Sequence, residues 1–493
     1  MKTNISLKIL LKYFVLIALL YMPIFGFLNT KPIRLWDESR LAINAYEMYN
    51  NGNFIVTHFN GKPDMWNTKP PLLIWLQTGF MHLIGVNELA VRLPSAIAAF
   101  FLCLFLLYFS IKFLKSFWLG FIIILVLITS HGYINFHATR TGDYDSLLTL
   151  FTTLYCITFF YFIETKENIY LYLFYVFLIF SVLTKSITGL LFLPALLIYV
   201  IYKKQFIFIL KNKHTYIGLF VFIFMVVGYY LLREIYNHGY ISAVYKNELG
   251  GRYLEVVENH KHSFWYYYNN FIDFKYKPWY IFIPAGLISG LFIKNKKIND
   301  LTLFAFLNTF VFFIVISTSQ TKLEWYDVPL YPFISILAGI FIYSIFYIIK
   351  LFPIINRITT INIFPYIFLF FIFITPYQKI IQKTYKPVEY SWDKKYYNIE
   401  YYLKDAIKGK HNLNNTKLLC EGYNAPILFY LNILHDKKIN LSLIKKENIE
   451  VGDKIIFNQK NIFDYVNQHF KYSVIESYDN LKICKIYEKR KKN

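Results

Sequence analysis

Long apolar segments constrain the fold of this sequence more than any other feature. Eleven segments of about 15–23 residues are dominated by apolar and aromatic side chains, and a helix of about 20 such residues crosses the ~30 Å hydrocarbon layer of a bilayer. A water-soluble protein could not bury the apolar surface of a chain that is 56% hydrophobic. The pattern therefore predicts an α-helical polytopic membrane protein with about eleven or more transmembrane helices. The segments are 9–28, 92–114, 117–131, 145–163, 168–183, 187–202, 216–233, 278–293, 302–318, 328–349 and 361–376.

The first segment has an alternative interpretation as a cleaved signal peptide, because Lys2, Lys8 and Lys12 supply a basic end. Its apolar run is longer than a signal core, and it is followed by Lys31 and Arg34 instead of the small residues of a cleavage site. We therefore predict a retained helix.

Basic residues gather in alternate short loops, and this sets the predicted orientation. If the N-terminus lies in the cytoplasm, all of these loops are cytoplasmic, as the positive-inside bias requires. Much of the net charge of +22 then reflects topology, so it does not indicate a nucleic-acid partner. The prediction is a multi-pass protein of the cytoplasmic (inner) membrane. The basic loop residues are Lys112, Lys115, Lys203, Lys204, Lys211, Lys213, Lys294, Lys296, Lys297, Lys350 and Arg357.

The same topology places four loops and the tail outside the cytoplasm. Residues 1–376 form the predicted transmembrane domain, whose outer loops are 29–91, 132–144, 234–277 and 319–327. Residues 377–493 carry more Lys, Asn and Glu, and short apolar stretches such as 417–419 and 454–457 alternate with helix-like ones. This favours a small extracytoplasmic α/β domain, large enough for its own core. Cys420 and Cys484 fall in it, and the sequence leaves open whether they form a disulfide.

The first outer loop carries the strongest chemical signals. Asp37 and Glu38 follow the first span, and Arg40 lies two residues after Glu38. Further along the loop, Lys69 precedes two prolines. One interpretation is structural: acidic residues stabilise a helix N-terminus, and a Lys-Pro-Pro turn opens an interfacial helix. The other is functional, because basic groups at a membrane surface bind a lipid phosphate and a carboxylate beside them performs acid–base chemistry on a hydroxyl.

Further polar residues reach the same predicted boundary. Arg140, Asp143 and Asp145 precede or begin the fourth span, where an ionisable group is costly and indicates function. The loop 319–327 contributes Lys322 and Tyr326. The loop 234–277 contributes His262 and its neighbour His260. The supporting candidates of the site are Glu38, Arg140, Asp143 and His262.

The order of these motifs resembles the polyprenyl-phosphate-dependent glycosyltransferases of the glycosyltransferase C superfold. The nearest branch contains the protein O-mannosyltransferases and the lipid A aminoarabinose transferases. The resemblance covers roughly residues 9–350. The motifs are Asp37-Glu38-x-Arg40, Asn60-Gly61-Lys62-Pro63, Lys69-Pro70-Pro71-Leu72, Ala90-Val91-Arg92-Leu93-Pro94-Ser95, Arg140-Thr141-Gly142-Asp143-Tyr144-Asp145, Leu183-Thr184-Lys185 and Lys322-Leu323-x-x-Tyr326-x-x-Pro329-Leu330-Tyr331-Pro332.

The resemblance implies a role for each matching position. It makes Asp37 the catalytic aspartate and Asp145 the second carboxylate of the site. It assigns Arg40 and Lys69 to the donor phosphate, with Tyr326 beside that phosphate and Lys322 next to it.

One position departs from the family pattern and bears on metal binding. Aminoarabinose transferases commonly carry a glutamate, which helps to bind a structural metal, where this chain has Thr68. His260 and His262 alone make a poor metal site. The sequence therefore supports no cofactor, and a divalent metal stays an open alternative without support.

The resemblance implies an inverting transfer of a sugar from a polyprenyl-phosphate donor to a lipid, protein or other envelope acceptor, within the bilayer and without nucleic acid. Two alternatives remain: a transporter or flippase for lipid-linked glycans, which would place charges at the midplane and show two repeated halves, and an inactive scaffold that binds through its tail. Neither the sugar nor the acceptor follows from the sequence.

Overall fold

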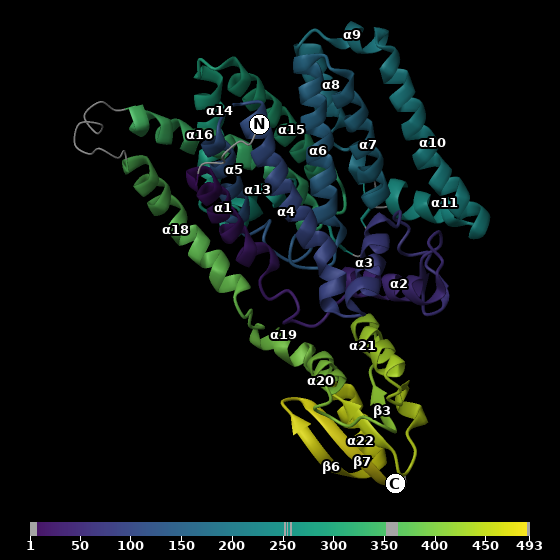
Figure 1. Cartoon of the computed structure of the whole chain (residues 1–493). Coiled ribbons are helices and arrows are strands. Elements are labelled where there is room, and N and C mark those ends of the chain that lie inside the picture. The colour runs from purple at the N-terminus through teal and green to yellow at the C-terminus, as the bar shows by residue number, and fades with distance from the viewer. Residues whose placement is uncertain (1–6, 251–252, 254, 257–258, 352–362, 491–493) are drawn as a thin grey trace.

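The computed structural model describes residues 7–250, 253, 255–256, 259–351 and 363–490, and it is dominated by a bundle of long helices (Figure 1). Each of the eleven apolar segments overlaps one of them; the first two positions of the last segment, 361 and 362, lie outside the described residues. The helices are α1 (Leu7–Phe25), α4 (Glu88–Lys112), α5 (Phe117–Ile128), α6 (Tyr144–Thr165), α7 (Asn168–Lys185), α8 (Leu193–Tyr202), α10 (Lys213–Tyr236), α14 (Phe282–Phe292), α15 (Lys296–Thr318), α16 (Tyr331–Leu351) and α18 (Phe364–Thr384).

Within the described residues, seven helices are long and apolar enough to cross a membrane, judged by length and composition alone. Four of the eleven predicted spans belong to a shorter class, namely α1, α5, α8 and α14. The 12 residues of α5 extend about 18 Å at 1.5 Å per residue, well short of a ~30 Å layer. Two of the segments begin in 3₁₀ turns, η1 (Ser186–Leu190) and η4 (Trp279–Ile281), so hydropathy merged a turn with the helix after it. The number of spans stays a prediction.

Helix α6 lies at the centre of the bundle and fixes where the site is built. Its most apolar window is 94% buried, against 11% for α10, which packs on α7 and leaves most of its side chains exposed. Thr149, Thr152 and Thr158 each donate a hydroxyl hydrogen bond to the carbonyl four residues earlier, which satisfies polar groups inside an apolar environment. The N-terminal turn of α6 therefore presents Asp145 at a fixed point of the core.

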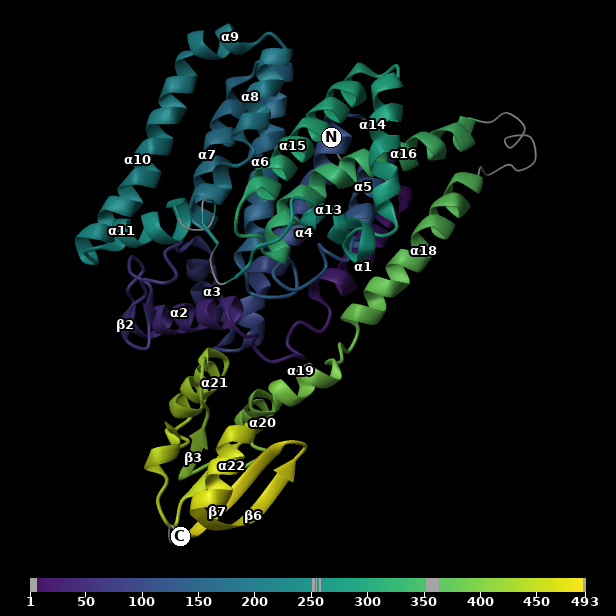
Figure 2. The same cartoon turned by 180° about the vertical axis from the view of Figure 1, so that it is seen from behind.

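The outer-loop helices lie across one end of the bundle, and α9 lies at the other end (Figures 1 and 2). Helix α2 (Asp37–Asn51) packs on α3 (Leu72–Ile84), and the short antiparallel strands β1 (His58–Phe59) and β2 (Lys62–Pro63) follow α2. The remaining short helices are α9 (Phe206–Lys211), α11 (Tyr240–Val244), η2 (Tyr245–Gly250), α13 (Tyr266–Asn270), η3 (Phe271–Lys275) and η5 (Glu324–Leu330).

The C-terminal residues form a mixed five-stranded sheet with helices around it, below the bundle in Figure 1. The strand order is β4-β3-β5-β7-β6, with β3 parallel to β4 and β5, and β7 antiparallel to β5 and β6. Strands β3 and β5 coincide with the apolar stretches 417–419 and 454–457. The elements are α19 (Ser391–Tyr396), α20 (Asn398–Ile407), β3 (Thr416–Leu419), α21 (Ala425–Asp436), β4 (Leu441–Ile444), η6 (Lys446–Asn448), β5 (Lys454–Phe457), α22 (Lys460–His469), β6 (Phe470–Tyr478) and β7 (Leu481–Lys489).

The tail packs directly on the first outer loop. The Tyr430 hydroxyl donates to Glu88 at 2.8 Å and accepts from the N–H of Ile33 at 2.9 Å, and Lys404 also contacts Glu88 at 3.0 Å. Trp36 stacks on Tyr423 with ring centroids 4.7 Å apart. These contacts hold the segment that leads into α2.

The four cysteines all lie in the described part of the chain and are free thiols. Cys420 follows β3 and Cys484 lies on β7, with β5 between the two strands. Two strand spacings amount to about 9.6 Å, beyond the ~7 Å that a disulfide can bridge between Cα atoms. The disulfide left open by the sequence is therefore absent.

Glu400 gives the tail a predicted pH dependence. Burial raises the pKa of Glu400 to about 8, so the folded tail favours its neutral form. The unfolded chain loses this proton near pH 4.3, so stability should fall as pH rises from there to about 8. We expect Glu400→Gln to melt like the wild type at pH 5 and at higher temperature at pH 9, by thermal unfolding of the solubilised chain. Exposed Glu447→Gln is the control, and equal melting of Glu400→Gln and wild type at pH 9 would contradict the assignment.

Candidate functional site

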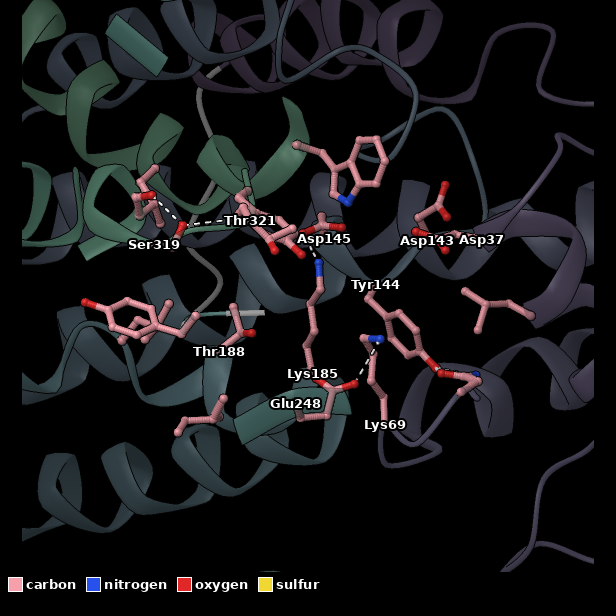
Figure 3. A pocket seen from close by; sticks show the side chains of 18 of the residues that line it. Asp37, Lys69, Asp143, Tyr144, Asp145, Lys185, Thr188, Glu248, Ser319 and Thr321 are labelled. Atoms are coloured by element: carbon pink, nitrogen blue, oxygen red, sulfur yellow. Dashed lines mark hydrogen bonds and ion pairs between the residues drawn. The ribbon is translucent and has the colours of Figure 1, made fainter. Parts of the chain in front are cut away.

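A cavity lies where α2, the start of α6, the end of α7 and η5 meet, and it brings together most of the predicted site residues (Figure 3). Of the ten residues singled out from the sequence, six line it: Asp37, Arg40, Lys69, Asp143, Asp145 and Tyr326. Its other wall is mainly apolar and comes from η1, the residue after it and α15, through Ile187, Leu191, Val315 and Ile316. The cavity therefore has a charged half and an apolar half.

Asp37 and Glu38 begin α2 and have opposite surroundings. The chain reverses at Trp36, whose φ of 68° is in the left-handed region, and two acidic residues in the first turn suit the positive end of the helix dipole. The Asp37 side chain is 53% exposed at the cavity, whereas that of Glu38 is 1% exposed. Adjacent carboxylates thus have different tasks.

Glu38 ties the first loop to the bundle. Its carboxylate accepts two hydrogen bonds from Arg92, at 2.7 and 2.9 Å, and one each from the N–H groups of Arg34 and Gly142. Burial raises the pKa of Glu38, but the charge of Arg92 and these hydrogen bonds outweigh burial and lower the pKa below its ordinary value. Glu38 is therefore an ionised positioning residue outside the cavity.

The turn before α6 is held by this network. The N–H of Gly142 binds Glu38, and its carbonyl accepts from Gln77 at 2.9 Å. A side chain at this position would meet Val91 at 2.5 Å, so only glycine allows the close approach to α4. The turn delivers Asp143 and Asp145 to the cavity from either side of Tyr144.

Asp145 forms a buried ion pair with Lys185 at the end of α7. Asp145 accepts a hydrogen bond from the Lys185 ammonium at 2.6 Å, and the side chains are 4% and 7% exposed (Figure 3). The same ammonium lies 5.5 Å from the centre of the Tyr326 ring, a cation–π distance. Side chains from α6, α7 and η5 therefore meet at the Lys185 ammonium.

Lys69 and Arg40 are each paired with a carboxylate. The Lys69 ammonium lies 3.2 Å from Glu248 of η2 (Figure 3) and 5.7 Å from the Tyr144 ring centre. Arg40 donates two hydrogen bonds to buried Asp64, at 2.8 and 2.6 Å. Both cations border the cavity, and their partners fix where the charges lie.

Four predicted residues lie outside this cavity. Glu38 is one of them, as described above. Lys322 donates to the carbonyl of Ser319, Arg140 donates to the carbonyls of Pro23, Ile24 and Gly26 at the end of α1, and exposed His262 stacks on Tyr266 with ring centroids 4.1 Å apart. The contacts of Lys322 and Arg140 are with backbone carbonyls. The donor-phosphate role of Lys322 and the supporting role of Arg140 stay predictions.

Known proteins resemble this chain in sequence and in fold. Residues 68–230 match the family described as dolichyl-phosphate-mannose-protein mannosyltransferase. A Shewanella sediminis protein named undecaprenyl phosphate-alpha-4-amino-4-deoxy-L-arabinose arabinosyl transferase is 27% identical over 353 residues, which is 68% of this chain and 60% of that protein. An uncharacterized Aquifex aeolicus protein is 27% identical over 346 residues, 67% of this chain and 64% of its own length. The chain thus spans less than two thirds of both relatives.

The crystal structure of ArnT from Cupriavidus metallidurans bound to undecaprenyl phosphate superposes with a TM-score of 0.70 at 13% identity, over 97% of both chains. The chain has a glycosyltransferase C fold. The shared fold, the family match over residues 68–230 and the Shewanella relative together confirm the resemblance drawn from the motif order. Within this glycosyltransferase C fold, the charged half of the cavity lies at the ends of α2, α6 and α7.

Three residues near the cavity received no role from the sequence. Lys185 was part of the Leu183-Thr184-Lys185 motif, but no role was attached to it. His137 lies only six residues before Asp143, and the structure sets it 3.5 Å from that carboxylate. Glu248 lies in the loop 234–277 with no local pattern to mark it, since its contact with Lys69 depends on how distant parts of the chain fold together.

Burial raises the pKa of the Asp143 carboxyl to about 6. Its side chain is 3% exposed, and one of its oxygens accepts from the Thr141 hydroxyl. Together with Asp37 and His137 it forms a group of described His, Cys, Asp or Glu residues whose ligand atoms all lie within 4.8 Å of one another.

Proposed function

We propose that the chain is an inverting glycosyltransferase that moves a sugar from a polyprenyl-phosphate donor to an envelope acceptor. The cavity carries this proposal, because carboxylates and cations line one half of it while Ile187, Leu191, Val315 and Ile316 line the other. A polyprenyl-phosphate sugar has the same division between a charged head and an apolar chain. The names of ArnT and of the Shewanella protein support the same donor class.

Asp37 is the proposed general base. It accepts the proton of the acceptor hydroxyl or amine, whose oxygen or nitrogen then attacks the anomeric carbon of the sugar. The bond from that carbon to the phosphate oxygen breaks as the new bond forms, and its electron pair leaves with the polyprenyl phosphate. A single displacement of this kind inverts the anomeric configuration.

The cations stabilise the leaving phosphate. Lys69 and Arg40 border the cavity, and the Lys185 ammonium lies between Asp145 and the Tyr326 ring. Fixed positive charges aimed at developing negative charge need no reorganisation during the reaction. We assign donor phosphate binding to Arg40, Lys69 and Tyr326. Asp145 orients the Lys185 ammonium.

The direct test uses the purified chain in proteoliposomes with radiolabelled polyprenyl-phosphate sugars and an envelope extract as acceptor. We expect label to move from the lipid to the extract, with release of polyprenyl phosphate. Mass spectrometry of envelope glycolipids and glycoproteins from a deletion strain would identify the acceptor. Movement of intact donor across the bilayer without release of polyprenyl phosphate would support transport instead.

Lys69→Ala should slow transfer at limiting donor. A charge-assisted contact contributes about 1.5–3 kcal/mol, or roughly 10–150-fold in affinity, and the alanine removes it. Lys62→Ala is the matched control, because Lys62 is exposed on β2 away from the cavity. If Lys69→Ala keeps wild-type turnover at limiting donor, Lys69 does not bind the donor and only forms part of the turn before α3.

The proposed orientation puts α2, α3 and the tail outside the cytoplasm. In a Cys420→Ser background, single cysteines replacing exposed Lys62 and Asn440 should react with a membrane-impermeant maleimide in intact cells. A cysteine replacing exposed Lys211 should react only after permeabilisation. The reverse pattern would overturn the orientation.

A further inference from the structure

Asp37, His137 and Asp143 form a compact cluster at the edge of the cavity. The His137 Nδ1 atom lies 3.5 Å from Asp143 Oδ1 and 3.8 Å from Asp37 Oδ2. The two carboxylates come from different parts of the chain, the start of α2 and the turn before α6, and Figure 3 shows them side by side.

These separations suit a shared cation. Ligands held tetrahedrally about 2.1 Å from a metal ion are about 3.4 Å apart. The two distances at His137 exceed this value by about 0.1 and 0.4 Å, and the three ligand atoms all lie within 4.8 Å of one another, so side-chain rotations would bring them into coordination. One imidazole and two carboxylates are ligands that Zn²⁺ and Mn²⁺ accept.

Two of the three ligand atoms are buried without a hydrogen bond. Among the described residues, neither His137 Nδ1 nor Asp143 Oδ1 has a hydrogen-bond partner, although almost no solvent reaches either atom. The Asp143 side chain is 3% exposed, so an oxygen without a hydrogen bond carries a desolvation cost that a ligand would offset. Both atoms face one another within the cluster.

The cluster is held in position by its neighbours. The Thr141 hydroxyl accepts from the backbone N–H of His137 at 2.8 Å and donates to the second oxygen of Asp143. The His137 ring stacks on Trp325 with centroids 3.5 Å apart and planes 6° apart. Such outer contacts orient metal ligands in proteins.

We propose that Asp37, His137 and Asp143 bind one divalent transition-metal ion, Zn²⁺ or Mn²⁺. The site lies in a wall common to two cavities, because Asp143 and Trp325 line both the donor cavity and a second one that His137 also lines. A cation there borders the space for the donor and the space beside the tail. A carboxylate can bind a metal through one oxygen, so Asp37 retains a second oxygen for proton transfer. Metal binding by these residues does not require the proposed transfer reaction.

The test measures metal content of the purified full chain in nanodiscs. After chelation, samples are dialysed against Zn²⁺, Mn²⁺ or Mg²⁺, and bound metal is counted by mass spectrometry. His137→Asn and Asp143→Asn are the test variants, since asparagine tolerates the positive φ of 56° at His137. His262→Ala is the control, because exposed His262 lies outside the cluster. Thermal melting confirms that each variant is folded, and X-ray absorption reports the ligand shell.

We expect one equivalent of Zn²⁺ or Mn²⁺ in the wild type and in His262→Ala, with a shell of nitrogen and oxygen. Loss of an outer partner already costs about 10–100-fold in metal affinity, so loss of a ligand in either test variant should lower affinity by about 100-fold or more. The proposal is overturned if the wild type binds no metal, if His262→Ala loses the metal, or if both folded test variants keep wild-type affinity. Preference for Mg²⁺ would overturn the choice of metal class.

Discussion

Asp37→Asn is expected to reduce sugar transfer by about 100–10,000-fold, the range that a positioned general base contributes. Asparagine keeps the size of the side chain but cannot accept the proton of the acceptor. Folding should change little, because the side chain is 53% exposed and asparagine is favourable at a helix N-terminus. The measurement is turnover of a polyprenyl-phosphate sugar alongside thermal melting of the solubilised chain.

Glu38→Gln provides the matched contrast one residue along the chain. Glu38 is 1% exposed and ion-paired with Arg92, so its neutralisation should lower stability because it leaves a buried guanidinium without its counter-charge. We therefore expect Asp37→Asn to separate activity from stability and Glu38→Gln to change both. If Asp37→Asn retains more than about a tenth of wild-type turnover, a general-base role is wrong.

The sequence predicted which outer segments build the site, because length, hydropathy and loop charge determine which ends of the helices share a side. It placed Asp37, Lys69 and Asp145 in one site, and all three line the same cavity. The order of the motifs indicated the role of Asp37, since composition alone could not distinguish a carboxylate that stabilises a helix N-terminus from a catalytic one.

Side-chain partners could not be predicted in the same way. Lys69 meets Glu248 and Asp145 meets Lys185, pairs separated by 179 and 40 residues, and these contacts depend on how α6, α7 and η2 pack. Lys322 shows the opposite problem. It lies four residues from Tyr326, yet its ammonium bonds to the Ser319 carbonyl while Tyr326 lines the cavity.

The hydropathy pattern also did not predict the lengths of the helices. Hydropathy marks where apolar residues run, but it does not show where a 3₁₀ turn replaces a helix, as at η1 before α8. The described helices therefore follow the eleven segments in position more closely than in length.

Lys185→Met is expected to impair both stability and transfer, because it leaves the Asp145 carboxylate buried without its cation. The carboxylate is 4% exposed, and removal of one partner from a buried ion pair typically costs about 3–5 kcal/mol. Methionine matches the length of lysine, so the cavity stays filled and the change is mainly one of charge. Thermal melting and turnover per folded molecule would be measured together.

Two further variants separate the contribution of charge from that of chemistry. Adding Asp145→Asn to Lys185→Met removes the orphaned charge, so the double variant should recover stability but not transfer. Lys203→Met is the control, because Lys203 pairs with Glu164 at 2.8 Å and with Asp300 at 2.9 Å near α9, at the opposite end of the bundle (Figure 1). It should lose stability and keep its turnover per folded molecule. Recovery of transfer in the double variant would show that the Asp145–Lys185 pair only supports the fold, and Lys69 and Arg40 would then carry donor binding without it.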